Sequence, residues 1–217
     1  MRAAAPLLML LLAGGCDTAA RQVATIRDPD IVALEDLKAQ QAAGRLSEIA
    51  DAPTPCTARS EACAQAQEIR GEACLTLARR QPAAPAAARW QDCAMDAFFA
   101  ARAALPADAD PARAHRLLAN AASAAMDQRD SVGRGLDRQF EAATALLELD
   151  ARDPAGCYHL ASARLARSLL LPQGPGRCAE LVLPASCAGV PPPPGIAAGQ
   201  RLPLEEMAAQ RRRLGCG

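Results

Sequence analysis

Cysteine is the residue type in this chain with the widest choice of chemistry, since thiols form disulfides, bind metals, act as nucleophiles or carry lipid. The 217-residue sequence has nine cysteines, an odd number. No two of them have the C-x-x-C spacing of a redox dithiol, a zinc ribbon or a c-type haem attachment site. If one thiol has a separate role, the other eight can all pair as disulfides. These eight are Cys56, Cys63, Cys74, Cys93, Cys157, Cys178, Cys187 and Cys216.

Cys16 is the cysteine that we expect to have the separate role. It closes a short apolar segment, in which Arg2 supplies a positive charge and Ala3 to Ala13 supply the apolar run. The ending Leu12-Ala13-Gly14-Gly15-Cys16 resembles the lipobox of bacterial lipoproteins. This resemblance implies that residues 1–15 are a signal peptide, that Cys16 carries lipid, and that residues 16–27 are a tether. It also implies a place in the cell envelope, facing the periplasm, on the inner or the outer membrane.

The alternative for this segment is an ordinary secretory signal that is cleaved elsewhere, which would leave Cys16 without lipid. A membrane-spanning helix is excluded, because spanning requires roughly twenty apolar residues and the run from Ala3 to Ala13 is much shorter.

The rest of the sequence lacks the common signatures of enzymes and of nucleic-acid binding. It has no G-x-S-x-G elbow, no H-E-x-x-H motif and no glycine-rich phosphate loop. His115 and His159 are the only histidines, and we expect them at the surface or partly packed on helices. The 24 basic and 24 acidic residues give no net charge, so a nucleic-acid partner is not expected. We therefore expect no catalytic residue, no metal site and no cofactor.

The composition predicts an all-α protein. Aromatic residues make up only 2% of the chain, whereas strands are rich in aromatic and β-branched residues. Alanine, leucine and arginine, which are the most frequent residues here, favour helix, and so does glutamate. An alanine-rich core buries little apolar area, so disulfides would add needed stability, and a bridge that closes about twenty residues contributes roughly 3 kcal/mol.

Helix boundaries can be placed from capping residues and prolines. Asp-Pro pairs at residues 28, 110 and 153 and a serine at 60 are typical helix starts. With the apolar spacing, they predict helices at about 28–44, 60–80, 87–105, 110 onward, 135–150, 153–171 and 203–213. Ile31, Leu34 and Leu37 are the expected apolar edge of the first helix, and Gly44 is its expected stop. Trp90 and Phe98 are expected core residues of the third.

Two features of residues 62–171 indicate an internal repeat. The Asp-Pro pairs at 110 and 153 lie 43 residues apart, and a shift of 42 superimposes two sets of apolar residues. These sets are Trp90, Ala94, Phe98, Ala101 and Leu105, and Val132, Leu136, Phe140, Ala143 and Leu147. The segment from Leu147 to Pro154, with Leu160-Ala161 after it, resembles the junction between two tetratricopeptide repeats. The resemblance implies antiparallel helical hairpins in a short stack, whose grooves bind peptides or proteins. A generic helical bundle is the alternative.

Hairpin geometry predicts one disulfide, because Cys74 and Cys93 lie at similar distances from the turn between their helices. Cys63 lies about 16 Å from Cys74 along one helix, too far to pair unless the helix breaks at Gly71. Cys56 could pair with Cys63. Cys157 could pair with Cys178 or Cys187, which would leave the other for Cys216.

The chain thus divides into residues 1–15, 16–27, a helical domain at 28–171, and a Cys- and Pro-rich extension at 172–217. We expect this extension to be irregular where it is rich in proline and glycine, before its last short helix. In the extension, Pro191 to Pro194 could be a ligand for an aromatic groove, although a rigid spacer is favoured. We expect a lipid-anchored, non-catalytic protein with a protein or peptide partner, used for interaction or scaffolding. The alternative is a small inhibitor or immunity-type lipoprotein that blocks a periplasmic enzyme through its extension.

Overall fold

The computed structural model describes residues 28–52, 54, 56, 59–81, 84–128, 134–194 and 203–216. Within these ranges all regular secondary structure is helical, which confirms the all-α prediction. The expected signal peptide, the tether and Cys16 lie outside the described residues, and so does Val132. Among the residues described, no helix contains an apolar stretch sufficient to span a bilayer.

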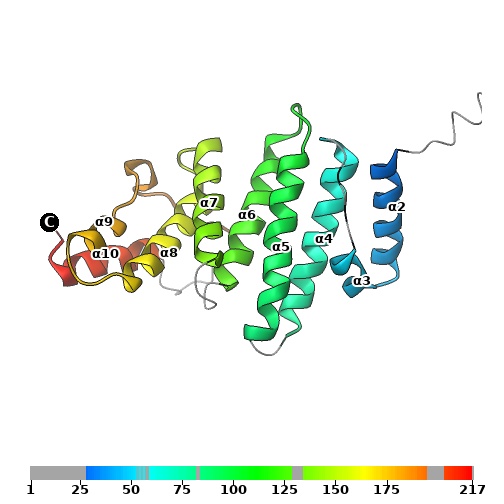
Figure 1. Cartoon of the computed structure of the whole chain (residues 1–217). Helices are drawn as coiled ribbons and strands as arrows, with labels where there is room; N and C mark the ends of the chain where they lie inside the picture. The colour runs from blue at the N-terminus through cyan, green and yellow to red at the C-terminus, as the bar shows by residue number, and fades with distance from the viewer. Residues whose placement is uncertain are drawn as a thin grey trace, which may run out of the picture.

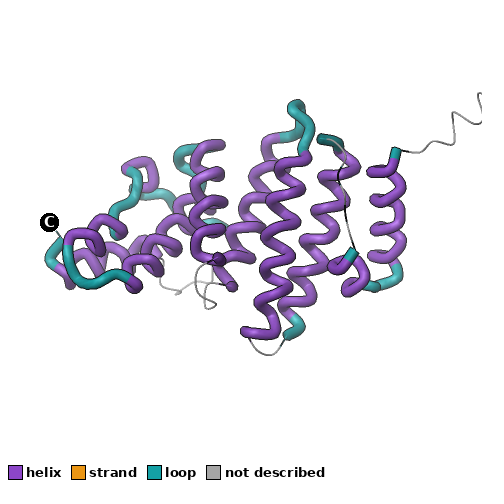
Figure 2. The backbone as a smooth tube through the Cα atoms, in the orientation of Figure 1, coloured by secondary structure: helices purple, strands orange, loops and turns teal. Residues whose placement is uncertain are grey.

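The helices follow one another in a row along the molecule, from α2 at one end to α9 and α10 at the other (Figure 1). Consecutive long helices run antiparallel, and each packs mainly on the helix before it and the helix after it, although α6 also contacts α8 (Figure 2). This is the expected short stack of helical hairpins. The elements are α2 (Pro29–Ala42), α3 (Leu46–Asp51), α4 (Glu61–Arg79), α5 (Ala84–Ala104), α6 (Pro111–Gln128), α7 (Arg134–Leu149), α8 (Pro154–Leu170), α9 (Pro175–Glu180), a 3-10 turn (Ala185–Cys187) and α10 (Pro203–Leu214).

Capping side chains begin the helices where the sequence indicated. The Ser60 side chain accepts a hydrogen bond from the backbone N–H of Cys63 at 3.1 Å. Asp153 Oδ1 accepts from the N–H of Gly156 at 2.6 Å. Such caps satisfy N–H groups that have no partner inside the helix. Gly44, with φ of 70°, follows the end of α2 in the left-handed conformation that favours glycine.

The N-terminal end differs from the expectation in two ways. Ile31 was expected on the apolar edge of the first helix but is 44% exposed, whereas Asp30 is buried. Asp30 is tolerated inside because its Oδ2 accepts a hydrogen bond from Ser60 Oγ at 3.1 Å. The sequence also gave no indication of the short helix α3, whose Ile49 is fully buried between α2 and α4.

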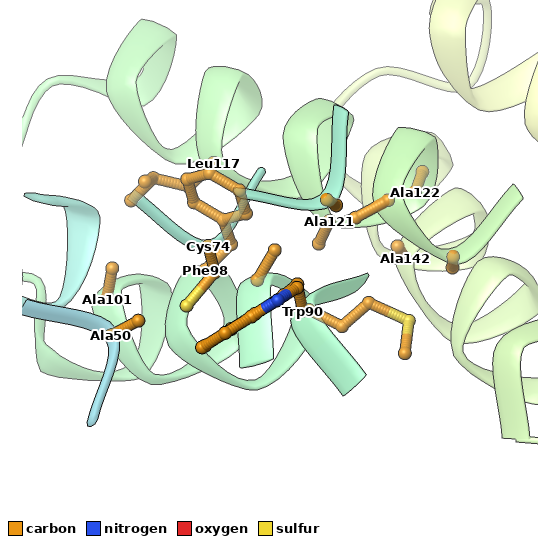
Figure 3. Packing of buried hydrophobic residues seen from close by; sticks show 14 of the residues in the cluster. Ala50, Cys74, Trp90, Phe98, Ala101, Leu117, Ala121, Ala122 and Ala142 are labelled. Carbon is orange, nitrogen blue, oxygen red and sulfur yellow. The ribbon is translucent and has the colours of Figure 1, made fainter. Parts of the chain in front are cut away.

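The main core is built largely of alanine, with a few large side chains between α4, α5 and α6 (Figure 3). Phe98 is fully buried and Trp90 nearly so, as their spacing predicted. Phe98 lies so close to α4 that a Cβ on Gly71 would be 2.8 Å from its ring. Glycine at this position therefore lets α4 and α5 approach closely. Phe140 of α7, which the shift of 42 superimposes on Phe98, is only half-buried. The two superimposed aromatic residues therefore differ in burial.

In the part of the chain that the structure describes, four disulfides hold the helices and the C-terminal extension together. The predicted Cys74–Cys93 pair joins α4 to α5, with Cα atoms 5.9 Å apart. Because α4 continues unbroken through Gly71, Cys63 pairs with Cys56 and not with Cys74. Of the alternatives for the extension, the structure has Cys157–Cys187 and Cys178–Cys216.

The extension packs against α8 through a small core of its own. This core contains Ala161 of α8, Leu181 after α9 and Met207 of α10. Helix α10 agrees with the predicted 203–213 helix, whereas α9 lies in a stretch that was expected to be irregular.

Candidate functional site

Helix α6 borders two clefts on its exposed side. One lies toward α2 and α4, and the other lies toward α8. At 100° per residue, the α6 side chains that line the two clefts span about 160° of the helix circumference. The clefts are therefore neighbours on one continuous side of α6. The α6 residues concerned are Arg113 and Arg116 in the first cleft, and His115, Ala119, Ser123 and Met126 in the second.

The first cleft has a volume of about 360 Å³ and is lined mainly by charged side chains of α4 and α6. Glu68 of α4 is its centre, because its carboxylate accepts hydrogen bonds from two arginines. Arg113 Nη2 donates to Glu68 Oε2 at 3.0 Å, and Arg116 Nη2 donates to Oε1 at 2.9 Å. Arg113 also contacts Glu61. These ion pairs fix α6 against α4 and leave a charged surface between them.

The ionisation of this cleft follows from its geometry. Burial alone would lower the pKa of Arg113, but hydrogen bonds to Glu61 and Glu68 outweigh it and raise the pKa. Desolvation in the cleft, with repulsion from Glu68, raises the pKa of Glu72, against the opposite effect of Arg116. The cleft therefore combines fixed arginine charges with a carboxyl group that binds a proton more readily than usual.

The second cleft, of about 320 Å³, is mostly apolar and lies between α6 and α8. The C-terminal extension forms part of its wall, since two prolines of the tetraproline run border it. Its lining residues are His115, Ala119, Ser123 and Met126 of α6, Ala155, Tyr158 and His159 of α8, and Pro193 and Pro194 of the extension.

One edge of the second cleft is fixed by a pair of polar side chains. His115 Nε2 donates to Asp153 Oδ2 at 2.6 Å, while the other oxygen of Asp153 caps α8. The same carboxylate thus begins α8 and holds α6 beside it. His115 is partly exposed, in agreement with the expectation for a surface histidine.

His159 differs from that expectation, because it is 5% exposed. Its Nε2 lies 3.5 Å from Ser123 Oγ, and its Nδ1 lies 3.4 Å from Gln139 Nε2. Burial lowers the pKa of His159 to about 4, in spite of the opposite effect of Asp153. An imidazole of such low basicity is a poor general base, and the long Ser123 contact does not prepare the hydroxyl for attack. The arrangement suits packing better than nucleophilic catalysis.

Among the residues that the structure describes, no three His, Cys, Asp or Glu side chains gather as a possible metal site. The predicted disulfide cysteines lie outside the linings of both clefts, although Cys157 directly precedes Tyr158. Sequence reasoning missed the charged residues around Glu68 and the contact of His115 with Asp153. For the second cleft, the sequence offered one signal, which was the isolated His159 within the apolar stretch of α8.

Comparisons of the chain with protein-family models, with curated proteins and with solved structures gave no match.

Proposed function

We propose that this protein is a lipid-anchored, non-catalytic interaction module of the bacterial cell envelope, which binds an extended segment of a partner protein along α4, α6 and α8. The observation that carries the proposal is the pair of adjacent clefts on the exposed side of α6. Helical stacks that leave such surfaces open commonly use them for protein binding.

The two clefts favour different parts of one partner segment. The first offers arginine and glutamate side chains, so charged or polar residues fit there. The second is lined mainly by alanine, methionine, tyrosine and proline, so an apolar residue fits there. A segment that crosses α6 would contact both, and this combination gives specificity that neither cleft has alone.

The cellular location rests on the cysteines. Four disulfides are typical of an oxidising compartment, and Cys16 is left as the expected lipid site. The residues between Cys16 and α2 would reach about 40 Å if fully extended. The helical body would therefore bind partners at a short distance from the membrane surface.

The lipid anchor is tested by metabolic labelling with a palmitate analogue. We expect the wild-type chain to be labelled and the Cys16→Ser variant to be unlabelled. A mature wild-type protein without lipid would contradict the proposed anchor and would leave the binding surface to be tested separately.

The binding surface is tested with the soluble Cys16→Ser protein, cross-linked and purified from envelope extract. Ala119→Trp places a large ring in the second cleft, and Ala103→Trp makes the same change at an exposed position of α5 that lines neither cleft. We expect Ala119→Trp to lose the partner and Ala103→Trp to retain it. Retention by both variants, or turnover of a substrate by the purified protein, would contradict the proposal.

A further inference from the structure

We propose that the cleft between α6 and α8 docks a proline-containing extended segment, and that Pro191–Pro194 of this chain competes for the same cleft from within the molecule. The inference rests on the proposed function and adds the chemistry of the partner segment. It also gives the tetraproline run, whose role the sequence left open, a definite place.

The proline run lies at the edge of the second cleft. Pro193 and Pro194 border the cleft opposite the side chains of α6 and α8. Pro193 is half-buried, whereas Pro191, Pro192 and Pro194 are exposed. The run therefore contacts the cleft chiefly through one ring, and most of its surface stays in solvent. A run with so little contact can be displaced by a partner segment that competes for the cleft.

A disulfide explains why the run lies there. Cys157 of α8 directly precedes Tyr158 and His159, and it is bonded to Cys187 of the extension. Pro193 follows Cys187 by six residues, which span about 19 Å at the polyproline rise of about 3.1 Å per residue. The Cys157–Cys187 bridge thus holds the run within reach of this cleft. A segment held by so short a connection has an effective concentration on the order of 1 mM.

The chemistry of the cleft fits a proline segment. Proline has no backbone N–H, so a proline run presents carbonyl acceptors and ring surfaces only. The hydroxyl groups of Ser123 and Tyr158 are potential donors to such carbonyls, and Ala119 and Met126 supply apolar surface. A polyproline II segment is already extended, and it loses little conformational entropy when it binds.

The proline run fills only part of the cleft, so a partner segment that displaced it would gain more contact surface than the run has. About 320 Å³ stays open beside Pro193 and Pro194, near the lower limit of volumes typical of ligand sites. The first cleft is less suitable for a proline segment, because its surface is dominated by the arginines around Glu68. The structure thus favours the second cleft as the proline site.

The test uses a fluorescent peptide with the sequence of residues 188–194, Ala-Gly-Val-Pro-Pro-Pro-Pro, and a matched peptide with alanine in place of proline. The dissociation constant of each peptide is measured for the soluble Cys16→Ser protein and for the same protein with Pro191–Pro194 all changed to serine. Suppose that the run Pro191–Pro194 binds the cleft with an intrinsic dissociation constant of about 0.1 mM and has an effective concentration of about 1 mM. Removal of this run should then tighten the binding of the proline peptide roughly tenfold. Pro193→Ser alone should give a smaller gain in the same direction.

Two further variants locate the peptide, both made in the serine-substituted protein. Ala119→Trp should abolish binding, and Ala103→Trp should leave it unchanged. If the proline peptide binds with equal affinity to the proteins with and without Pro191–Pro194, the proposed competition is overturned. Binding of the alanine peptide as tight as that of the proline peptide, or no binding to any variant, overturns the proline preference. Since partner capture from envelope extract is measured independently, a failure here is distinguishable from a failure of the proposed function.

Discussion

Burial of His159 should make the stability of the helical body depend on pH. The pKa of this imidazole is 6.5 when it is unperturbed and about 4 in the folded protein. Between these values the unfolded chain binds a proton that the folded chain does not bind. The free energy of unfolding therefore falls as the pH falls from 6.5 toward 4, and above pH 6.5 His159 causes no such loss.

The size of this effect follows from the two pKa values. Each unit of difference corresponds to about 1.4 kcal/mol, so the whole shift corresponds to about 3 kcal/mol. Between pH 7 and pH 4.5 the expected loss from this histidine alone is about 2 kcal/mol. That loss is large for a domain whose total stability is typically about 5–15 kcal/mol.

Urea unfolding at pH 7 and pH 4.5 measures the effect. Carboxyl groups also titrate in this range, so the informative quantity is the difference between the wild-type protein and His159→Gln. We expect the wild-type protein to lose about 2 kcal/mol more than the variant between the two pH values.

His115→Gln is the matched control for this experiment, since it removes the other histidine and leaves the buried one. It should retain the extra loss at acidic pH that is seen in the wild-type protein. Parallel losses in the wild-type protein and His159→Gln would show that His159 is solvated, and would refute the reasoning.

Three further predictions concern packing, the disulfides and the ion pairs. Gly71→Ala would normally stabilise a helix by about 1 kcal/mol, but the added Cβ would lie 2.8 Å from Phe98. We expect a net loss of about 1–2 kcal/mol in urea unfolding, relieved by Phe98→Leu, and a stabilised variant would disprove the close approach. Replacing Cys74 and Cys93 together by serine should cost about 3 kcal/mol in the same assay, and a loss below about 1 kcal/mol would contradict the bridge's role. Glu68→Gln should cost about 1–3 kcal/mol, because two arginines lose their shared carboxylate, whereas the same change at an exposed glutamate of α7 should have little effect.

The long helices could be predicted because their starting signals are local. An Asp-Pro pair or a capping serine acts on N–H groups only two or three residues away, so Ser60 and Asp153 are readable in the sequence. Helices α3 and α9 could not be found this way. Each has six residues and no side-chain cap, so they depend on contacts with the rest of the fold. Burial of Ile49 against α4 is such a contact.

The candidate site was much less predictable than the fold. The Cys74–Cys93 pair could be inferred, because two positions equidistant from one turn must lie at one level of a hairpin. The clefts depend on how α6 is rotated against α4 and α8. That rotation brings Glu68 beside Arg113, 45 residues later, and His115 beside Asp153, 38 residues later. Close packing of many small side chains sets it, and no local pattern in the sequence encodes such packing.

The abundance of alanine explains both the thin core and the open clefts. Small side chains let the helices approach closely, as they do around Phe98, and they bury little area at each contact. On the exposed side, Ala119 and Ala155 leave unfilled the space that larger residues would occupy. The disulfides offset the weak core from positions outside both cleft linings, so the side of α6 that bears the clefts stays open. The Cys157–Cys187 bridge has two consequences. It stabilises the extension, and it holds the proline run beside the cleft. Stability and control of binding would then depend on the same covalent bond.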